Sequence, residues 1–145
     1  MAKKLSSIHS LAFLLAMIIT SLAPLPVLAD DRAEIFDMAE TFAKCSGIFR
    51  VMSLATTGAS SEQDKQLANG ARVASFYIGR SLGLNDAVAF TDNLVETEVT
   101  AWLASMEVNP NAMASSFEPE YKKCMALLPV QDDIIKQARR EAYSN

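Results

Sequence analysis

The residues best suited to chemistry in this sequence are its two cysteines, Cys45 and Cys124. Roughly 80 residues separate them, unlike the Cys-x-x-Cys spacing that is typical of redox enzymes. In a small exported protein, two such cysteines most often pair. Closing a loop of roughly 80 residues would stabilise the fold by about 4.5 kcal/mol if the effect is entropic. We therefore predict a structural disulfide, with two buried thiols or a redox pair as the alternatives.

Two acidic residues form the next candidate pair. Asp92 and Glu96 have i, i+4 spacing in a segment with helical periodicity, so their side chains share one helix face. Neighbouring carboxylates can act as an acid and a base, or they can bind a divalent cation. A solvated helix face is the more common meaning of this spacing. The pair is therefore the only candidate for carboxylate catalysis, and an ordinary surface is the simpler interpretation.

Histidine is missing from the part of the chain that we expect to function. His9 is the only histidine, and it lies in an N-terminal segment with the features of a cleavable signal. Without histidine, the mature chain cannot use Ser-His-Asp or Cys-His catalysis, and it lacks the most common transition-metal ligand. The sequence also contains neither a calcium-loop pattern nor a glycine-rich phosphate loop. We expect no enzyme activity, no metal site and no cofactor.

The first residues have the composition of an export signal. Lys3 and Lys4 make a positive start, an apolar stretch follows at residues 11–22, and small residues precede the expected cleavage between Ala29 and Asp30. An uncleaved membrane anchor is the alternative. However, the apolar stretch could reach a spanning length of about 17 residues only by including two prolines. A signal peptide that is removed is therefore the preferred interpretation.

Cleavage of residues 1–29 would leave a single domain, residues 30–145, in the periplasm or outside the cell. Two of the 13 basic residues and none of the 17 acidic ones would be lost, so the formal net charge would fall from −4 to 11 − 17 = −6. An acidic chain without a basic run argues against nucleic acid or an anionic membrane as the main partner. We expect contact with a membrane only through the transient signal peptide.

The mature sequence predicts helices throughout, because apolar residues recur at spacings of three and four. Four to five helices with short connections predict an all-α antiparallel bundle. Cys45 and Cys124 fall on the expected inner faces of the first and fourth helices, so one disulfide would staple these two helices together. The expected helices cover residues 31–56, 60–82, 86–106, 116–128 and 132 onward, with caps at Ser60 or Ser61, Asn85 or Asp86, Ser115 or Ser116, and Asp132 or Asp133.

Periodicity also predicts the inner stripe of the first helix, which consists of Ile35, Met38, Phe42, Cys45, Phe49 and Met52. The residues expected to stop helices are Gly83, Pro110 and Pro129, and Pro119 is expected in the first turn of the fourth helix.

Three aromatic residues are candidates for a binding surface. Phe76, Tyr77 and Ile78 are consecutive on one expected helix, so they cannot all face a single core. Trp102 adds a large apolar side chain on the next expected helix. We take Phe76, Tyr77 and Trp102 as the candidate surface for a ligand or a partner, although apolar residues at helical spacing more often form an ordinary core.

The surroundings of the two cysteines resemble those in a broad group of small exported bacterial all-helical proteins to which no activity is assigned. Members carry one cysteine in the first helix, here in AKCSG at residues 43–47, and one in a late helix, here in YKKC at residues 121–124. Periplasmic acid-stress chaperones and toxin-immunity proteins share the general plan of signal, helical bundle and single disulfide. The resemblance, together with the missing catalytic motifs, leads us to expect a non-enzymatic module that binds a protein partner in the periplasm as a chaperone, inhibitor or immunity factor. The alternative is a carrier of a hydrophobic small molecule in the bundle core.

Overall fold

The computed structural model of the protein describes residues 27–144. Most of the expected signal peptide, residues 1–26, lies outside this range, and the expected cleavage between Ala29 and Asp30 falls in the first turn of the first described helix. None of the helices in the described range is long and apolar enough to cross a membrane.

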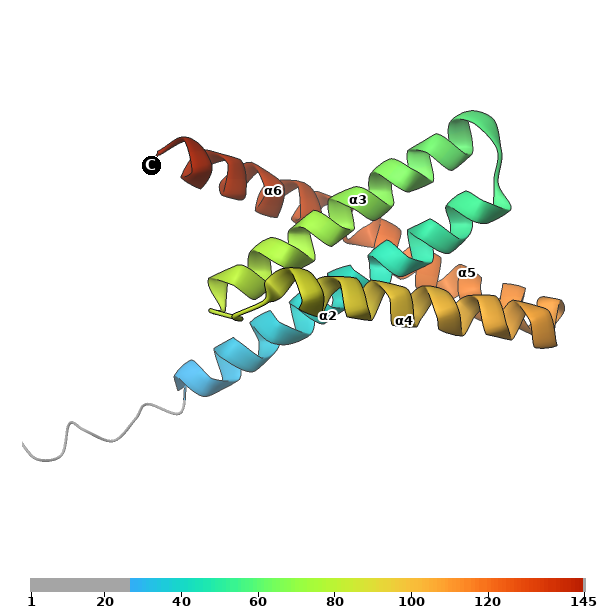
Figure 1. Cartoon of the computed structure of the whole chain (residues 1–145), viewed down its shortest axis with the longest axis horizontal. Coiled ribbons are helices and arrows are strands. Elements are labelled where there is room, and N and C mark those ends of the chain that lie inside the picture. Colours follow the sequence, from blue (N-terminus) through green and yellow to red (C-terminus); the bar gives the residue numbers. More distant parts are fainter. Residues whose placement is uncertain (1–26, 145) are drawn as a thin grey trace, which may run out of the picture. The chain divides into compact units, whose positions relative to one another are not determined.

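Five helices and no strand make up the described residues, which confirms the predicted all-α fold. They are α2 (Val27–Ala55), α3 (Gly58–Ser81), α4 (Ala87–Val108), α5 (Pro110–Ala126) and α6 (Leu128–Tyr143). Successive helices α2, α3 and α4 alternate in direction, and α5 and α6 run back one after the other (Figure 1). Helix α3 packs against α4 and α6, while α5 packs against α4. The result is the predicted antiparallel bundle, in which the last two helices, α5 and α6, follow each other in the same direction.

Helix α2 supplies much of the core, and its buried surface is wider than the single stripe of apolar residues expected from the sequence. The expected inner positions Phe42, Cys45 and Phe49 are buried, but Ile35 and Met38 near its start are 40% and 42% exposed. Helix α2 also buries residues on both sides of that stripe, because more than one helix covers it. These additional buried residues are Ala39, Ala43, Ser46, Ile48 and Val51.

Local sequence signals set the ends of α3 and α4 as predicted. Gly83 follows α3 with a φ of 76°, a backbone conformation that glycine adopts without the steric cost of a side chain. The backbone N–H of Leu84 donates to the carbonyl of Gly79 at 3.1 Å, which closes the end of the helix. At the start of α4, the Asp86 side chain accepts a hydrogen bond from the N–H of Ala89 at 2.9 Å.

The predicted start of α3 was wrong. The helix begins at Gly58, with Thr57 in the cap position, rather than after Ser60 or Ser61. The Ser61 hydroxyl instead donates to the carbonyl of Ser53 at 2.8 Å. The side chain expected to cap α3 therefore forms a hydrogen bond with the preceding helix instead. A local sequence pattern does not reveal such a bond.

The predicted starts of the last two helices were also wrong. Helix α5 begins at Pro110, where the Asn109 side chain accepts a hydrogen bond from the N–H of Ala112 at 3.1 Å, and Pro119 lies inside the helix rather than in its first turn. Ser115 and Ser116 donate to the carbonyl of Ala112 instead of capping. Helix α6 likewise begins at Leu128, with Pro129 in its first turn, instead of at Asp132 or Asp133. Proline fits the first turn because that turn needs no N–H donor, so each proline begins the helix that follows it.

Candidate functional site

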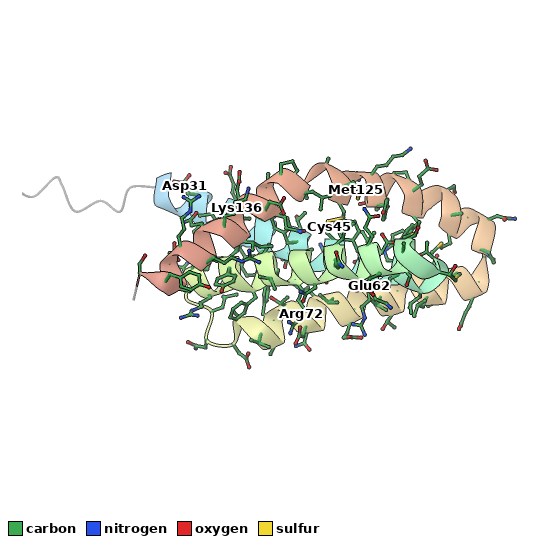
Figure 2. The ribbon with its side chains drawn as sticks, turned by 90° about the horizontal axis from the view of Figure 1, so that it is seen from above. Asp31, Cys45, Glu62, Arg72, Met125 and Lys136 are labelled. Atoms are coloured by element: carbon green, nitrogen blue, oxygen red, sulfur yellow. A yellow bond between two sulfur atoms is a disulfide. The ribbon has the colours of Figure 1, made fainter. Side chains whose placement is uncertain are left out.

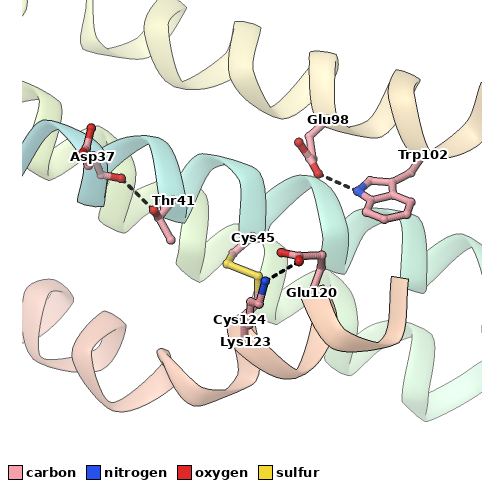
Figure 3. The surroundings of a disulfide bond; sticks show 8 residues. All are labelled: Asp37, Thr41, Cys45, Glu98, Trp102, Glu120, Lys123 and Cys124. Atoms are coloured by element: carbon pink, nitrogen blue, oxygen red, sulfur yellow. Dashed lines mark hydrogen bonds and ion pairs between the residues drawn. A yellow bond between two sulfur atoms is a disulfide. The ribbon is translucent and has the colours of Figure 1, made fainter. Parts of the chain in front are cut away.

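A disulfide joins Cys45 on α2 to Cys124 on α5, with 5.3 Å between their Cα atoms (Figure 3). This bond confirms the predicted pairing and the predicted connection between an early and a late helix. Both cysteines are buried, at 3% and 4% exposure. The burial of both sulfurs favours a structural bond over a redox pair that must meet a partner.

The two carboxylates of α4 are each held by an arginine from another helix. Arg72 extends from α3 toward α4 (Figure 2). It forms a two-pronged ion pair with Asp92, with Nε–Oδ1 at 2.6 Å and Nη2–Oδ2 at 2.9 Å. Arg50 on α2 forms the corresponding ion pair with Glu96. The hydrogen bond from Arg72 lowers the pKa of Asp92 below its usual value, which favours a permanently ionised carboxylate over a proton-transferring one.

These ion pairs line a groove of about 430 Å³ where α2, α3 and α4 meet, which we call the polar groove. Ser46, Ala68 and Val95 contribute small or apolar surface to it. Its charged and amide side chains are Arg50 from α2, Lys65, Asn69 and Arg72 from α3, and Asp92 and Glu96 from α4. No group of three or more His, Cys, Asp or Glu side chains able to hold a metal ion occurs here or elsewhere in the described part of the chain.

A second groove, of about 250 Å³, is lined mainly by apolar side chains, and we call it the methionine groove. One wall is the last part of α2 and the other is the first half of α5, with one side chain from α4. Its apolar lining consists of Val51, Met52, Ala55, Met106, Met113, Ala114 and Phe117. Sequence reasoning missed this groove, although Met113, Phe117 and Tyr121 recur every fourth residue and therefore share one face of α5.

A buried carboxylate lies beside this groove. Asp64 on α3 is 5% exposed, and its two oxygens accept hydrogen bonds from the hydroxyls of Tyr121 at 3.1 Å and Thr56 at 3.3 Å. Burial, together with the hydrogen bond to Asp64, raises the pKa of the Tyr121 hydroxyl, which also lines the methionine groove. Sequence reasoning missed Asp64 because an acid in the first part of a helix normally faces solvent. Its spacing of three and seven residues from Leu67 and Ala71, which apolar periodicity places on the inner face of the same helix, was the available signal.

The three aromatic residues proposed from the sequence lie on two helices and contact different partners. Phe76 and Tyr77 are half-buried on α3, and their rings contact each other with centroids 5.4 Å apart. Trp102 is also half-buried, but its ring meets Phe117 of α5 edge-on at 5.1 Å, and its N–H donates to Glu98 at 2.6 Å (Figure 3). Trp102 thus packs between α4 and α5, next to a residue that lines the methionine groove.

No family model, curated protein or solved structure matches this chain.

Proposed function

We propose that this chain is a non-enzymatic protein-interaction module of the periplasm or the extracellular space, such as a chaperone, an inhibitor or an immunity factor. The observation that supports this most directly is the methionine groove, a concave surface lined mainly by apolar side chains. Methionine side chains are flexible and polarisable, so such a surface can adapt to different apolar partners.

The size of the methionine groove favours a protein partner over a free small molecule. Sites for small molecules usually measure about 300–1,000 Å³, and this groove measures about 250 Å³. A space of this size suits one or two apolar side chains projecting from a partner, which is how buried anchor residues contribute most of the energy in protein interfaces. We therefore propose that an apolar side chain of the partner inserts between α2 and α5.

The disulfide supports the same proposal because it holds the two walls of the groove together. Met52 lies about two helical turns beyond Cys45 on α2, and Phe117 lies about two turns before Cys124 on α5. A groove whose walls are covalently tied loses little conformational freedom when a partner binds. The disulfide also fits an oxidising compartment, as does the signal peptide expected from residues 1–29.

A photo-crosslinking amino acid placed in the groove would test this proposal. We would place it at Ala55, on the α2 wall, with Ala104 on α4 as an exposed control that does not line the groove. We expect a discrete crosslinked species from position 55 in the exported protein and none from position 104. Ala114→Trp, which fills the groove from the exposed position opposite, should reduce the yield about tenfold, as expected when a buried anchor is excluded.

Two outcomes would contradict the proposal. The first is equal crosslinking from positions 55 and 104, which would indicate nonspecific contact. The second is crosslinking from position 55 that Ala114→Trp leaves unchanged, because a partner that does not enter the groove would be indifferent to its filling.

A carrier for a hydrophobic small molecule is the second candidate, and the apolar lining of the same groove favours it. A chain of a few methylene groups would fit about 250 Å³, a volume larger than the roughly 150 Å³ cavity that can hold benzene. Native mass spectrometry of the exported protein should then show a bound mass. A clean mass of the protein alone, together with no uptake of a fluorescent lipid, would contradict this candidate.

A further inference from the structure

We infer that the polar groove between α2, α3 and α4 binds a small ligand through an oxyanion group, a carboxylate or a phosphate. This site goes beyond the protein-interaction function proposed above, because the polar groove and the methionine groove share no lining residue.

The first observation is a hydroxyl group in the groove that has no partner. Ser46 lines the groove and is only 2% exposed, yet its hydroxyl makes no hydrogen bond within residues 27–144. Every fully buried side-chain nitrogen or oxygen in that range has a hydrogen-bond partner. The Ser46 hydroxyl is therefore not fully enclosed, and because Ser46 lines the groove we place its opening there, where a ligand can reach it. A nearly buried polar group that is left open in this way is a feature of binding sites rather than of ordinary cores.

The second observation is that the groove holds more hydrogen-bond donors than its own carboxylates engage. Asp92 already receives two hydrogen bonds from Arg72, and Glu96 receives one from Arg50. Each guanidinium has more N–H groups than these bonds use. The Asn69 amide has no partner within the described residues, so it offers further donors. Spare donors on fixed arginines match the oxygens of a carboxylate or phosphate.

The helices place these donors together by their spacing. Arg50 follows Ser46 by four residues on α2, so the hydroxyl and the guanidinium lie on one face. Lys65 and Asn69 have the same spacing on α3. Three cations and two carboxylates therefore line the groove, in a chain that is acidic as a whole, and Lys65 also lies 3.8 Å from Glu62 on its own helix. Asp92 and Glu96, the pair that first suggested catalysis, act here as positioning residues for the arginines.

Nuclear magnetic resonance titration of the purified disulfide-bonded protein would test this inference. Sodium phosphate and sodium acetate would be added in separate series, with sodium chloride at equal ionic strength as the reference. We expect saturable shifts at the Ser46 amide, the Arg50 Nε–H and the Asn69 side-chain amide. Saturation with phosphate alone identifies a phosphate ligand, saturation with acetate alone identifies a carboxylate, and saturation with both identifies a general oxyanion site. Failure of both anions to give saturable shifts overturns the inference.

Matched variants separate a built site from general attraction of anions. Ser46→Ala and Arg50→Gln should each raise the Kd about tenfold, as expected for loss of a hydrogen bond to a charged group. Lys123→Gln removes the same charge from an exposed position on α5, outside the groove, and should leave the Kd unchanged. Alanine is well tolerated in helices, so Ser46→Ala keeps the test valid even if Arg50→Gln folds poorly. Equal weakening by Lys123→Gln and Arg50→Gln, or no effect of Ser46→Ala, would overturn the inference.

Discussion

Removing the disulfide between Cys45 and Cys124 should destabilise the protein by about 2–5 kcal/mol, the usual range for loss of a native disulfide. The two cysteines are 79 residues apart, and cross-linking a loop of that length lowers the entropy of the unfolded chain by an amount worth about 4.5 kcal/mol at 25 °C. Both residues are buried, so Cys→Ala variants also lose packing, at about 0.8 kcal/mol for each methylene-sized group. Domains of this size are stable by only about 5–15 kcal/mol, so the variant would be marginal.

Urea denaturation at 25 °C would measure this change in the double variant Cys45→Ala/Cys124→Ala. Far-ultraviolet circular dichroism follows the helices, and fluorescence follows Trp102, the single tryptophan. Coincident transitions from the two signals would justify a two-state fit. The midpoint should fall, and the dependence on urea should steepen, because the unfolded chain without its cross-link exposes more surface.

The reduced wild-type protein provides a control, since it lacks the bond but keeps both sulfur atoms. It should lose nearly as much stability as the double variant, and each single Cys→Ala variant should lose as much as the double variant. A loss below about 1 kcal/mol in the double variant, far under the range for native disulfides, would refute the reasoning. Equal urea dependence with and without the bond would show that the cross-link does not restrict the unfolded chain.

The structure supports three further predictions. Gly47→Ala should destabilise the protein by about 1–2 kcal/mol despite better helix propensity, because its Cβ would lie 2.7 Å from the Cβ of Glu98 on α4; urea denaturation measures this. Asp86→Ala should cost about 1 kcal/mol in the same assay through loss of the cap of α4. The ion pair with Arg72 lowers the pKa of Asp92 in the folded protein. The pair should therefore stabilise the fold fully at pH values above about 3.9, the pKa of an aspartate in the unfolded chain. This stabilisation should disappear as the pH falls through the lower pKa that Asp92 has in the folded protein. Asp92→Asn should therefore cost under about 1 kcal/mol at pH 7, because the pair is partly exposed, and nothing near pH 2, as measured by urea denaturation across pH.

Each of these predictions has a matched control. An alanine at Gly70 would meet only the far end of the Gln131 side chain, so Gly70→Ala should cost less than Gly47→Ala, and the opposite order would contradict the packing argument. Asp86→Asn keeps a capping oxygen and should cost only a few tenths of a kcal/mol. For the ion pair, the stability difference between the wild-type protein and Asp92→Asn should shrink as the pH falls. A difference that grows instead would contradict the predicted pH dependence.

The sequence by itself determined the fold class, the disulfide and several helix ends. The fold class and the helix ends depend on local sequence patterns, and two cysteines allow only one pairing. Helical periodicity marks inner faces without knowledge of the neighbours, as at Phe42 and Phe49. Asp86 and Gly83 act on groups within a few residues of themselves. With only two cysteines in the chain, only one intramolecular disulfide is available.

Local rules failed where one residue type has two opposite effects. Pro110 and Pro129 were expected only to stop the helices before them. Helices α4 and α5 do end just before these prolines, and each proline also lies in the first turn of the next helix. Both readings obey the same chemistry, since proline lacks an N–H and an N–H is not needed in a first turn. Whether a new helix forms directly after the proline depends on whether that segment finds a surface to pack on, and Phe117 and Cys124 on α5 are buried against the other helices.

Only the tertiary structure decided which side chains meet across helices, and this decided both grooves. Spacing placed Asp92 and Glu96 on one face of α4, but it could not show that Arg72 and Arg50 approach from α3 and α2. The same holds for the bond between Asp64 and Tyr121. Periodicity specifies the face of a helix, whereas a contact also requires the axial offset, rotation and crossing angle of its neighbour. Those quantities arise from packing the whole bundle at once, so the sites between helices emerge only with the fold.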